Sequence, residues 1–319
     1  LDHPVRGTGA SHEDVLSFAF TFTARDSDGD IVQNNFVVNV IDDSPVAGVG
    51  TASTVEDESL HGGNNETETP DLSASVHHVA LNIAWGADNA NPTHGGGLGD
   101  RSVAFANGDV AVSGAYNGTT LTSLGQTVSY TVLPDGQLVG YTGSAPASTS
   151  AGNVVFYVSL SDENNGDYDF TLVKPLDHSA GNGENGLTLT FNYTATDSDG
   201  DTSSNHFTVT VVDDAPVLAA ASLGVRTVEE EQGAVAGPGN EDAGGVGDQD
   251  QSFLGLVYND RTTEKATGSL GINWGADNAN DNDGQPGDRS VQFVEVADPD
   301  GLTSRGAAVH YGVETSADG

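Results

Sequence analysis

Residues 16–30 read LSFAFTFTARDSDGD, and residues 187–201 read LTLTFNYTATDSDGD. In both stretches apolar residues alternate with small or polar residues, which is the period of a strand with one buried face. Each stretch ends in the same acidic, glycine-containing turn. The two copies lie 171 residues apart, and such self-similarity at a fixed period predicts an array of one structural unit.

Further blocks recur in the same order and divide the chain into repeats. The sequence VIDDSPV (40–46) returns as VVDDAPV (211–217), WGADNAN (85–91) returns as residues 274–280, and LDH (1–3) returns as residues 176–178. We therefore expect residues 1–46 to be the C-terminal part of one repeat, 47–217 a complete repeat, and 218–319 the N-terminal part of a third. Linkers are expected just after the two Asp-Asp-x-Pro runs.

The fold class follows from the many short strands and the absence of helical periodicity. About ten strands per repeat, separated by loops rich in Gly, Asn and Asp, predict an all-β protein. The specific expectation is a tandem array of antiparallel β-sandwich repeats with immunoglobulin-like or Greek-key connections and calcium-binding loops. Besides the two quoted stretches, the expected strands are 79–85, 103–106, 128–132, 154–160, 168–173 and 207–211.

Charge and composition exclude several classes of partner. The chain has 47 Asp plus Glu against nine Lys plus Arg, and its formal net charge is −38. Binding to nucleic acid requires clustered cations, so no nucleic-acid partner is expected. There is no cysteine and no apolar run of the roughly 20 residues that a membrane helix needs. We expect no membrane insertion, and stability from apolar cores and bound cations.

The first acidic motif is the DSDGD loop, defined here as Asp26, Asp28 and Asp30, with the copy Asp197, Asp199 and Asp201. Three carboxylates at alternate positions around a glycine can direct several oxygens towards one point, as calcium requires. The loop is not an EF-hand, because its glycine is at the fourth position and no helices flank it. The alternative is a solvated acidic turn without metal.

The second motif, the Asp-Asp end, comes at the last strand of each repeat. It comprises Asp42 and Asp43, with the copy Asp213 and Asp214, and a second acidic group follows each. Carboxylates on both sides of a junction could share ions that fix the angle between repeats. An acidic strand end stopped by proline is the equal alternative. The following acidic group comprises Glu56 and Asp57 in one copy and Glu229 and Glu230 in the other.

The third motif, the Trp loop, is WGADNAN with the Asp-Arg pair that follows it. Its candidate calcium ligands are Asp88 and Asp100, with the copies Asp277 and Asp288. The arginine next to the second aspartate could instead form an internal ion pair that orders the loop. One tryptophan per repeat at a strand end is expected to be core, and the His77-His78 pair gives little reason to expect zinc.

This ordered series of motifs resembles the tandem extender repeats of giant RTX-type adhesins, which Gram-negative bacteria export by type I secretion. The resemblance covers essentially the whole chain and implies calcium-stiffened β-sandwich modules. It also implies that the carboxylates of the DSDGD loop are calcium ligands. The glycine-rich nonapeptide of the RTX secretion region is absent, since residues 95–100 and 244–249 only approach it.

The expected function is therefore a structural spacer: a rod of repeats at the bacterial cell surface that holds several calcium ions and serves attachment and biofilm formation. Its expected partners are neighbouring repeats and other copies of the chain, together with an unknown cell-surface or glycan ligand. Two alternatives remain at this stage, a calcium-dependent glycan or surface-binding module and a self-assembling filament or surface-layer subunit. No catalytic motif is present, so we do not expect an enzyme.

Overall fold

The computed structural model describes residues 15–64, 72–94, 99–114, 120–179, 181, 183–218, 268–280, 289–293, 301–304 and 306–310. All regular structure in these ranges is β, which confirms the all-β prediction. None of the described segments is a helix long and apolar enough to cross a membrane. The chain divides into two compact units, Leu1–Ala215 with Trp274–Gly319, and Pro216–Asn273.

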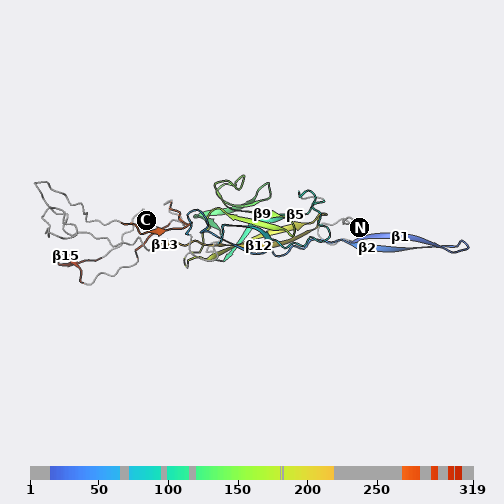
Figure 1. Cartoon of the computed structure of the whole chain (residues 1–319), viewed down its shortest axis with the longest axis horizontal. Helices are drawn as coiled ribbons and strands as arrows, with labels where there is room; N and C mark the ends of the chain where they lie inside the picture. Colours follow the sequence, from blue (N-terminus) through green and yellow to red (C-terminus); the bar gives the residue numbers. More distant parts are fainter. Residues whose placement is uncertain are drawn as a thin grey trace. The chain divides into compact units, whose positions relative to one another are not determined.

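Strands β3 to β12 form two sheets within the first unit (Figure 1). The six-stranded sheet has the order β4 (Ser75–Ala80), β10 (Asp167–Leu172), β9 (Val154–Ser161), β8 (Leu138–Thr142), β7 (Gln126–Val132) and β6 (Thr122–Ser123). The four-stranded sheet has the order β3 (Ser53–Glu56), β12 (Thr202–Val212), β11 (Gly186–Thr196) and β5 (Ser102–Gly114). All neighbours are antiparallel except β3 and β12, which are parallel, so the expectation of purely antiparallel sheets is wrong at this one pair.

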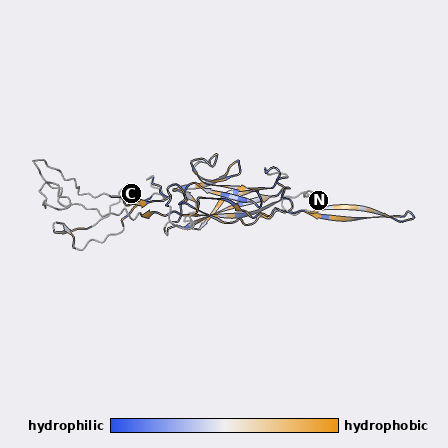
Figure 2. Ribbon diagram, viewed as in Figure 1, coloured by the Kyte–Doolittle hydropathy of each residue, from blue (hydrophilic) through white to orange (hydrophobic). Residues whose placement is uncertain are grey.

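Aromatic side chains join the two sheets around one core. Phe170 of β10 lies with its ring centroid 6.1 Å from that of Phe191 on β11, and Tyr168 stacks on Phe207 of β12 at 4.0 Å. These four side chains are fully buried. Face-to-face packing of two sheets over a shared core is the arrangement of a β-sandwich. Figure 2 shows the apolar residues that supply this core distributed along the strands.

The expected strand 79–85 differs from the structure. Strand β4 ends at Ala80, and Asn82 has a positive φ of 61°, which breaks the extended conformation. Leu81, Ile83 and Trp85 nevertheless point alternately into the core. The predicted alternation of buried and exposed residues is therefore correct, but the predicted strand pairing over residues 81–85 is wrong. Sequence reasoning did not identify the short strands β3 and β8.

A two-stranded sheet precedes this pair of sheets in sequence, formed by β1 (Val15–Arg25) and β2 (Ile31–Ile41). Phe20 pairs with Phe36 in it, as Phe191 pairs with Phe207 between β11 and β12. Leu16, Phe18, Phe20 and Phe36 are exposed, whereas their copies Leu187, Leu189, Phe191 and Phe207 are buried. The remaining strands pair as β13 (Val217–Leu218) with β14 (Ile272–Asn273) and β15 (Thr303–Ser304) with β16 (Ala307–Ala308).

Candidate functional site

Each Asp-Asp end receives the Trp loop of the next repeat through the same hydrogen bond. The backbone N–H of Ala87 donates to Oδ2 of Asp43 at 2.8 Å, and that of Ala276 donates to Oδ2 of Asp214 at 2.6 Å. We call the contact of Asp42 and Asp43 with the Trp loop of residues 85–91 the first junction. The contact of Asp213 and Asp214 with residues 274–280 is the second junction.

A glycine in each Trp loop makes this close approach possible. Gly86 has φ +75° and Gly275 has φ +78°, a conformation that L side chains rarely adopt. A Cβ atom on either residue would lie 2.5 Å from Oδ2 of the opposing aspartate, Asp43 or Asp214. The glycine of the WGADNAN motif is therefore required by the packing of one repeat against the next.

The other two carboxyl groups of each junction also pair. The carboxyl groups of Asp42 and Asp88 interact with each other, and so do those of Asp213 and Asp277. In each pair the first residue ends one repeat and the second belongs to the Trp loop of the next. The Asp-Asp end and the Trp loop, which sequence analysis treated as separate motifs, thus form one site.

An arginine and a tryptophan order the Trp loop in both copies. The guanidinium carbon of Arg101 lies 5.0 Å from the ring centroid of Trp85, and that of Arg289 lies 5.3 Å from Trp274. Among the described residues, Arg101 makes this cation–π contact and donates from Nε to the carbonyl of Asp162 at 3.1 Å. These contacts order the loop around Arg101.

Asp100 is buried, and its carboxylate is hydrogen-bonded within the Trp loop region. It accepts hydrogen bonds from the backbone N–H and the hydroxyl of Thr93, the former at 3.0 Å. The indole of Trp85 is 5% exposed and donates to the carbonyl of Asn164, in agreement with the expected core role.

The second copy of the DSDGD loop joins the first junction. It connects β11 to β12, and the N–H of Ser198 donates to the carbonyl of Asp88 at 2.9 Å. One carboxylate oxygen each of Asp42, Asp88 and Asp199 lies within 4.8 Å of the other two. Three oxygen ligands so arranged suit a hard cation such as calcium, whose remaining ligands can be carbonyls or water.

Burial makes ionisation of this acidic site unfavourable. Desolvation, reinforced by the charge of Asp199, raises the pKa of Asp42 to about 6 and also raises that of Asp88. Desolvation and the hydrogen bond from Asp199 raise the pKa of Asp197 to about 7. Carboxylates whose ionised form is destabilised by burial and by neighbouring charges are those that a bound cation would stabilise most.

The first copy of the DSDGD loop has the same turn in an exposed setting. Oδ1 of Asp26 accepts from the N–H groups of Gly29 and Asp30 at 3.0 and 2.8 Å, as Oδ1 of Asp197 does in the second copy. Hydrogen bonds from Asp28 and from the backbone lower the pKa of Asp26. Single oxygens of Asp26, Asp28 and Asp30 lie within 4.8 Å of one another, as the sequence pattern predicted.

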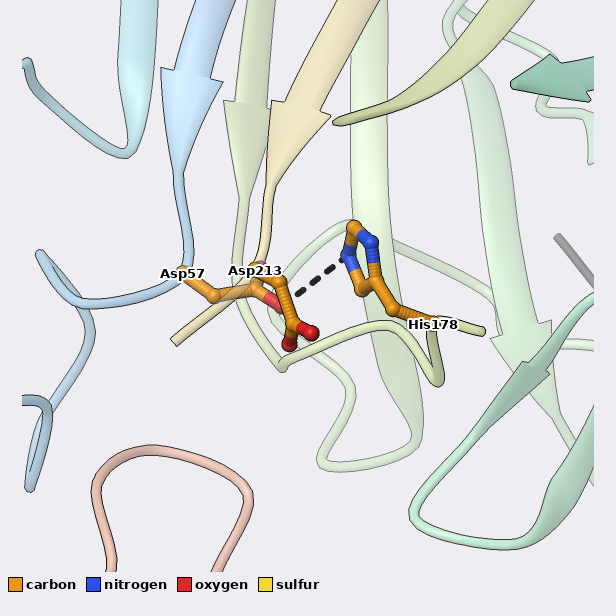
Figure 3. Close-up of side chains that lie close together, drawn as sticks. All are labelled: Asp57, His178 and Asp213. Atoms are coloured by element: carbon orange, nitrogen blue, oxygen red, sulfur yellow. Dashed lines mark ion pairs between the residues drawn. The ribbon is translucent and has the colours of Figure 1, made fainter. Parts of the chain in front are cut away.

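The second junction holds a different set of side chains, shown in Figure 3. Asp57 follows β3 and Asp213 follows β12, and the parallel register that pairs Glu56 with Val212 brings these two residues to the same end of the sheet. His178, from the loop between β10 and β11, points towards both. Its Nε2 lies 3.6 Å from Oδ2 of Asp57.

Burial and neighbouring charges shift the pKa values of the ionisable groups at this junction. Burial raises the pKa of Asp57 well above its usual range, and it also raises that of Asp213. Desolvation, with Asp57 and Asp213 nearby, raises the pKa of Asp277 to about 9. Burial lowers the pKa of His178, opposed by the charge of Asp213.

The structure regroups some of the predicted ligands. Asp57 lies with Asp213 of its own repeat instead of sharing a site with Asp42, because β3 leads away from the linker. Glu56 is buried, and its Oε2 accepts the N–H of Leu72 at 3.0 Å. Glu229, Glu230 and Asp288 lie outside the described residues.

Sequence reasoning missed two residues of the second junction. His178 was visible only as part of the recurring Leu-Asp-His block, which carried no chemical assignment. Asn64 donates its N–H to Oδ2 of Asp214 at 3.1 Å and its amide to the carbonyl of Ala215 at 2.6 Å. No sequence signal identifies Asn64.

The exposed histidine pair lies beside carboxylates of β10, and one ligand atom each of His78, Asp167 and Asp169 lies within 4.8 Å of the other two. Nδ1 of His77 lies 3.6 Å from Asp169, and Nδ1 of His78 lies 3.7 Å from Asp167. Both aspartates belong to strand β10.

Part of the chain matches a known family model. Residues 53–210 match the family model DUF5801, a domain of unknown function. The matched segment begins at β3 and ends within β12, so it covers the two packed sheets. A search of curated proteins finds no match.

Proposed function

We propose that this chain consists of calcium-stabilised structural repeats of a large secreted bacterial surface adhesin, which act as a rigid spacer in attachment and biofilm formation. The observation that carries the proposal is the recurrence of one junction geometry at two places, down to the hydrogen bond between Asp43 and Ala87 and its copy between Asp214 and Ala276. A contact that is repeated between successive units is what a spacer needs.

The chemistry of the first junction supports calcium as the stabilising ion. At the first junction Asp42 and Asp88 supply carboxylates from two repeats, and Asp199 adds a third. Ionised carboxylates whose oxygens lie within 4.8 Å of one another repel unless a cation neutralises them. The formal net charge of −38 adds to this repulsion. A cation bound there would hold both repeats at once.

Calcium affinity also suits a protein that works outside the cell. Extracellular calcium modules bind with dissociation constants of about 10⁻⁴ to 10⁻³ M, so such sites fill only after export. A ligand that binds only the folded state adds about 2.7 kcal/mol per site at a hundredfold excess over its dissociation constant. Several sites of this kind would couple calcium binding to folding.

The test is thermal unfolding of the 319-residue chain, followed by circular dichroism and calorimetry in millimolar calcium, in magnesium, and in EGTA. We expect a higher Tm in calcium than in magnesium, and the lowest Tm in EGTA. A Tm that does not change in EGTA would reject the proposal. Equal stabilisation by calcium, magnesium and high sodium would indicate a general response to ionic strength instead.

A second candidate function, assembly of the chain with copies of itself, is favoured by the apolar side chains of β1 and β2. Phe20 and Phe36 stack with ring centroids 5.2 Å apart, yet they are 47% and 51% exposed. Exposed apolar surface of this kind commonly marks an interaction site. Analytical ultracentrifugation over a range of concentrations, with and without calcium, tests it, and a monomer at all concentrations would exclude it.

A further inference from the structure

The second junction differs chemically from the first, because it contains an imidazole. The first brings together three carboxylates, those of Asp42, Asp88 and Asp199. At the second, one ligand atom each from Asp57, His178 and Asp213 lies within 4.8 Å of the other two. Calcium prefers oxygen ligands, whereas imidazole nitrogen is a typical ligand of zinc, copper, nickel and iron.

Two side chains of this cluster are buried: that of His178 is 1% exposed and that of Asp57 is 0% exposed. Asn185 lies beside the imidazole of His178 and interacts with it through its side chain and backbone. Neither ring nitrogen of His178 makes a hydrogen bond of standard geometry with a described residue, nor does Oδ1 of Asp57. Buried polar atoms normally have partners, so atoms without one that face each other indicate a ligand between them.

The ion pair alone does not satisfy these atoms. The distance of 3.6 Å between Nε2 of His178 and Oδ2 of Asp57 exceeds that of a hydrogen bond. Oδ2 of Asp57 already accepts the backbone N–H of Leu176 at 3.2 Å. Zinc bonds of about 2.0–2.2 Å to nitrogen and oxygen would require only small movements of the ligand atoms from their present separations.

We propose that Asp57, His178 and Asp213 form a binding site for a divalent transition-metal ion, of which zinc is the representative. The carboxyl group of Asp277, which interacts with that of Asp213, is placed to contribute a fourth ligand from the next repeat. Two carboxylates and one imidazole make a mixed nitrogen and oxygen set, which binds zinc more tightly than it binds calcium. The inference does not depend on the spacer function.

The experiment measures zinc retention in the presence of excess calcium. The 319-residue protein is stripped with a chelator, loaded with zinc in millimolar calcium, desalted, and analysed by mass spectrometry of the metals. We expect one zinc per chain, held against calcium. His178→Gln and Asp57→Asn should each weaken zinc binding by more than the 10- to about 100-fold that loss of an outer-shell partner causes.

The matched control is the double substitution of His77→Gln and His78→Gln. These residues also lie beside carboxylates, but their side chains are 59% and 82% exposed. The control should retain the zinc. Release of zinc by calcium, or full retention of zinc by His178→Gln, would overturn the proposal.

X-ray absorption at the zinc edge gives a readout that needs no substitution. The spectrum of the unsubstituted protein should show one imidazole among nitrogen and oxygen ligands. A spectrum without imidazole would overturn the proposal even if the substituted proteins failed to fold. The zinc measurements are made in millimolar calcium and without EGTA, so they are independent of the thermal-unfolding test. A Tm that does not change in EGTA together with retention of zinc in calcium would reject the calcium proposal and support this inference.

Discussion

Asp42, which follows β2, and Asp88, in the Trp loop, bring their carboxyl groups together in a buried site. Burial raises the pKa of both groups and so favours their protonated forms, whereas a bound cation would favour the ionised forms. Calcium-free and calcium-bound protein should therefore respond in opposite ways to removal of one charge from this pair.

The substitution Asp42→Asn tests whether the change in Tm has opposite signs without and with calcium. In EGTA the substitution should raise the Tm by a few degrees, because the amide removes a buried acid whose charge is unfavourable. In millimolar calcium it should lower the Tm, because an amide is a weaker calcium ligand than a carboxylate. Differential scanning calorimetry in both conditions measures the two shifts. Asp109→Asn, at an exposed position of β5 away from both junctions, is the control and should show neither shift.

The pH dependence of stability in the absence of calcium follows from the raised pKa values. Asp42 and Asp197 have folded-state pKa values of about 6 and about 7, above the roughly 3.9 of an unfolded aspartate. Their contribution is full below that unfolded value and is lost as the pH rises through 6 and 7. Urea unfolding in EGTA should thus show a free energy of unfolding that falls between about pH 4 and pH 7.

Calcium supplies the control for that pH series. A bound cation keeps the carboxylates ionised and lowers their pKa, so the decline with pH should be smaller or reversed in calcium. A free energy of unfolding that rises from pH 4 to pH 7 in EGTA would contradict the assignment of buried, protonated acids at the junctions.

Glycine substitution tests the contact between repeats. Gly86→Ala introduces a Cβ atom 2.5 Å from Oδ2 of Asp43 as well as strain at φ +75°. Gly136→Ala introduces strain alone, since Gly136 has φ +87° and nothing within 4 Å of the added atom. Both should lose about 1 kcal/mol from the strained backbone, and Gly86→Ala should lose more. Chemical unfolding measures the difference, and equal losses would argue against a tight junction at Asp43.

Two equivalent phenylalanines test which copy of the strand pair carries a core. Phe191 is fully buried between the sheets, while Phe20 is 47% exposed. Phe191→Ala should lower the free energy of unfolding by about 3–5 kcal/mol, because it leaves a cavity. Phe20→Ala should cost far less in the monomer. Similar losses would mean that β1 and β2 are covered in solution, for example by another copy of the chain.

The sequence patterns were sufficient to predict the all-β class and several of the longer strands, including β1, β9, β11 and β12. The alternation in residues 187–194 corresponds to β11, whose Leu187, Leu189 and Phe191 are buried. Strand β3 escaped prediction because only four residues pair there, and Ser53 and Thr54 show little apolar pattern. Its parallel pairing with β12 depends on tertiary packing that no local signal encodes.

The candidate site was predicted as residues but not as an arrangement. Asp42 and Asp88 were both selected, yet nothing in their separate motifs indicates that they meet. Their contact depends on how one repeat docks on the next. His178 was overlooked because a single histidine near a strand has no distinctive pattern; only its burial beside Asp57 distinguishes it.

The parallel pairing of β3 with β12 has a mechanical consequence. Strand β3 comes first and β12 last among the strands of the two packed sheets. A force that stretches the chain is therefore applied to β3 at Ser53 and to β12 at Val212. In a parallel pair those forces act along the strands in opposite directions, which loads the hydrogen bonds between them in shear. They must then break together instead of unzipping one by one, and this geometry resists stretching.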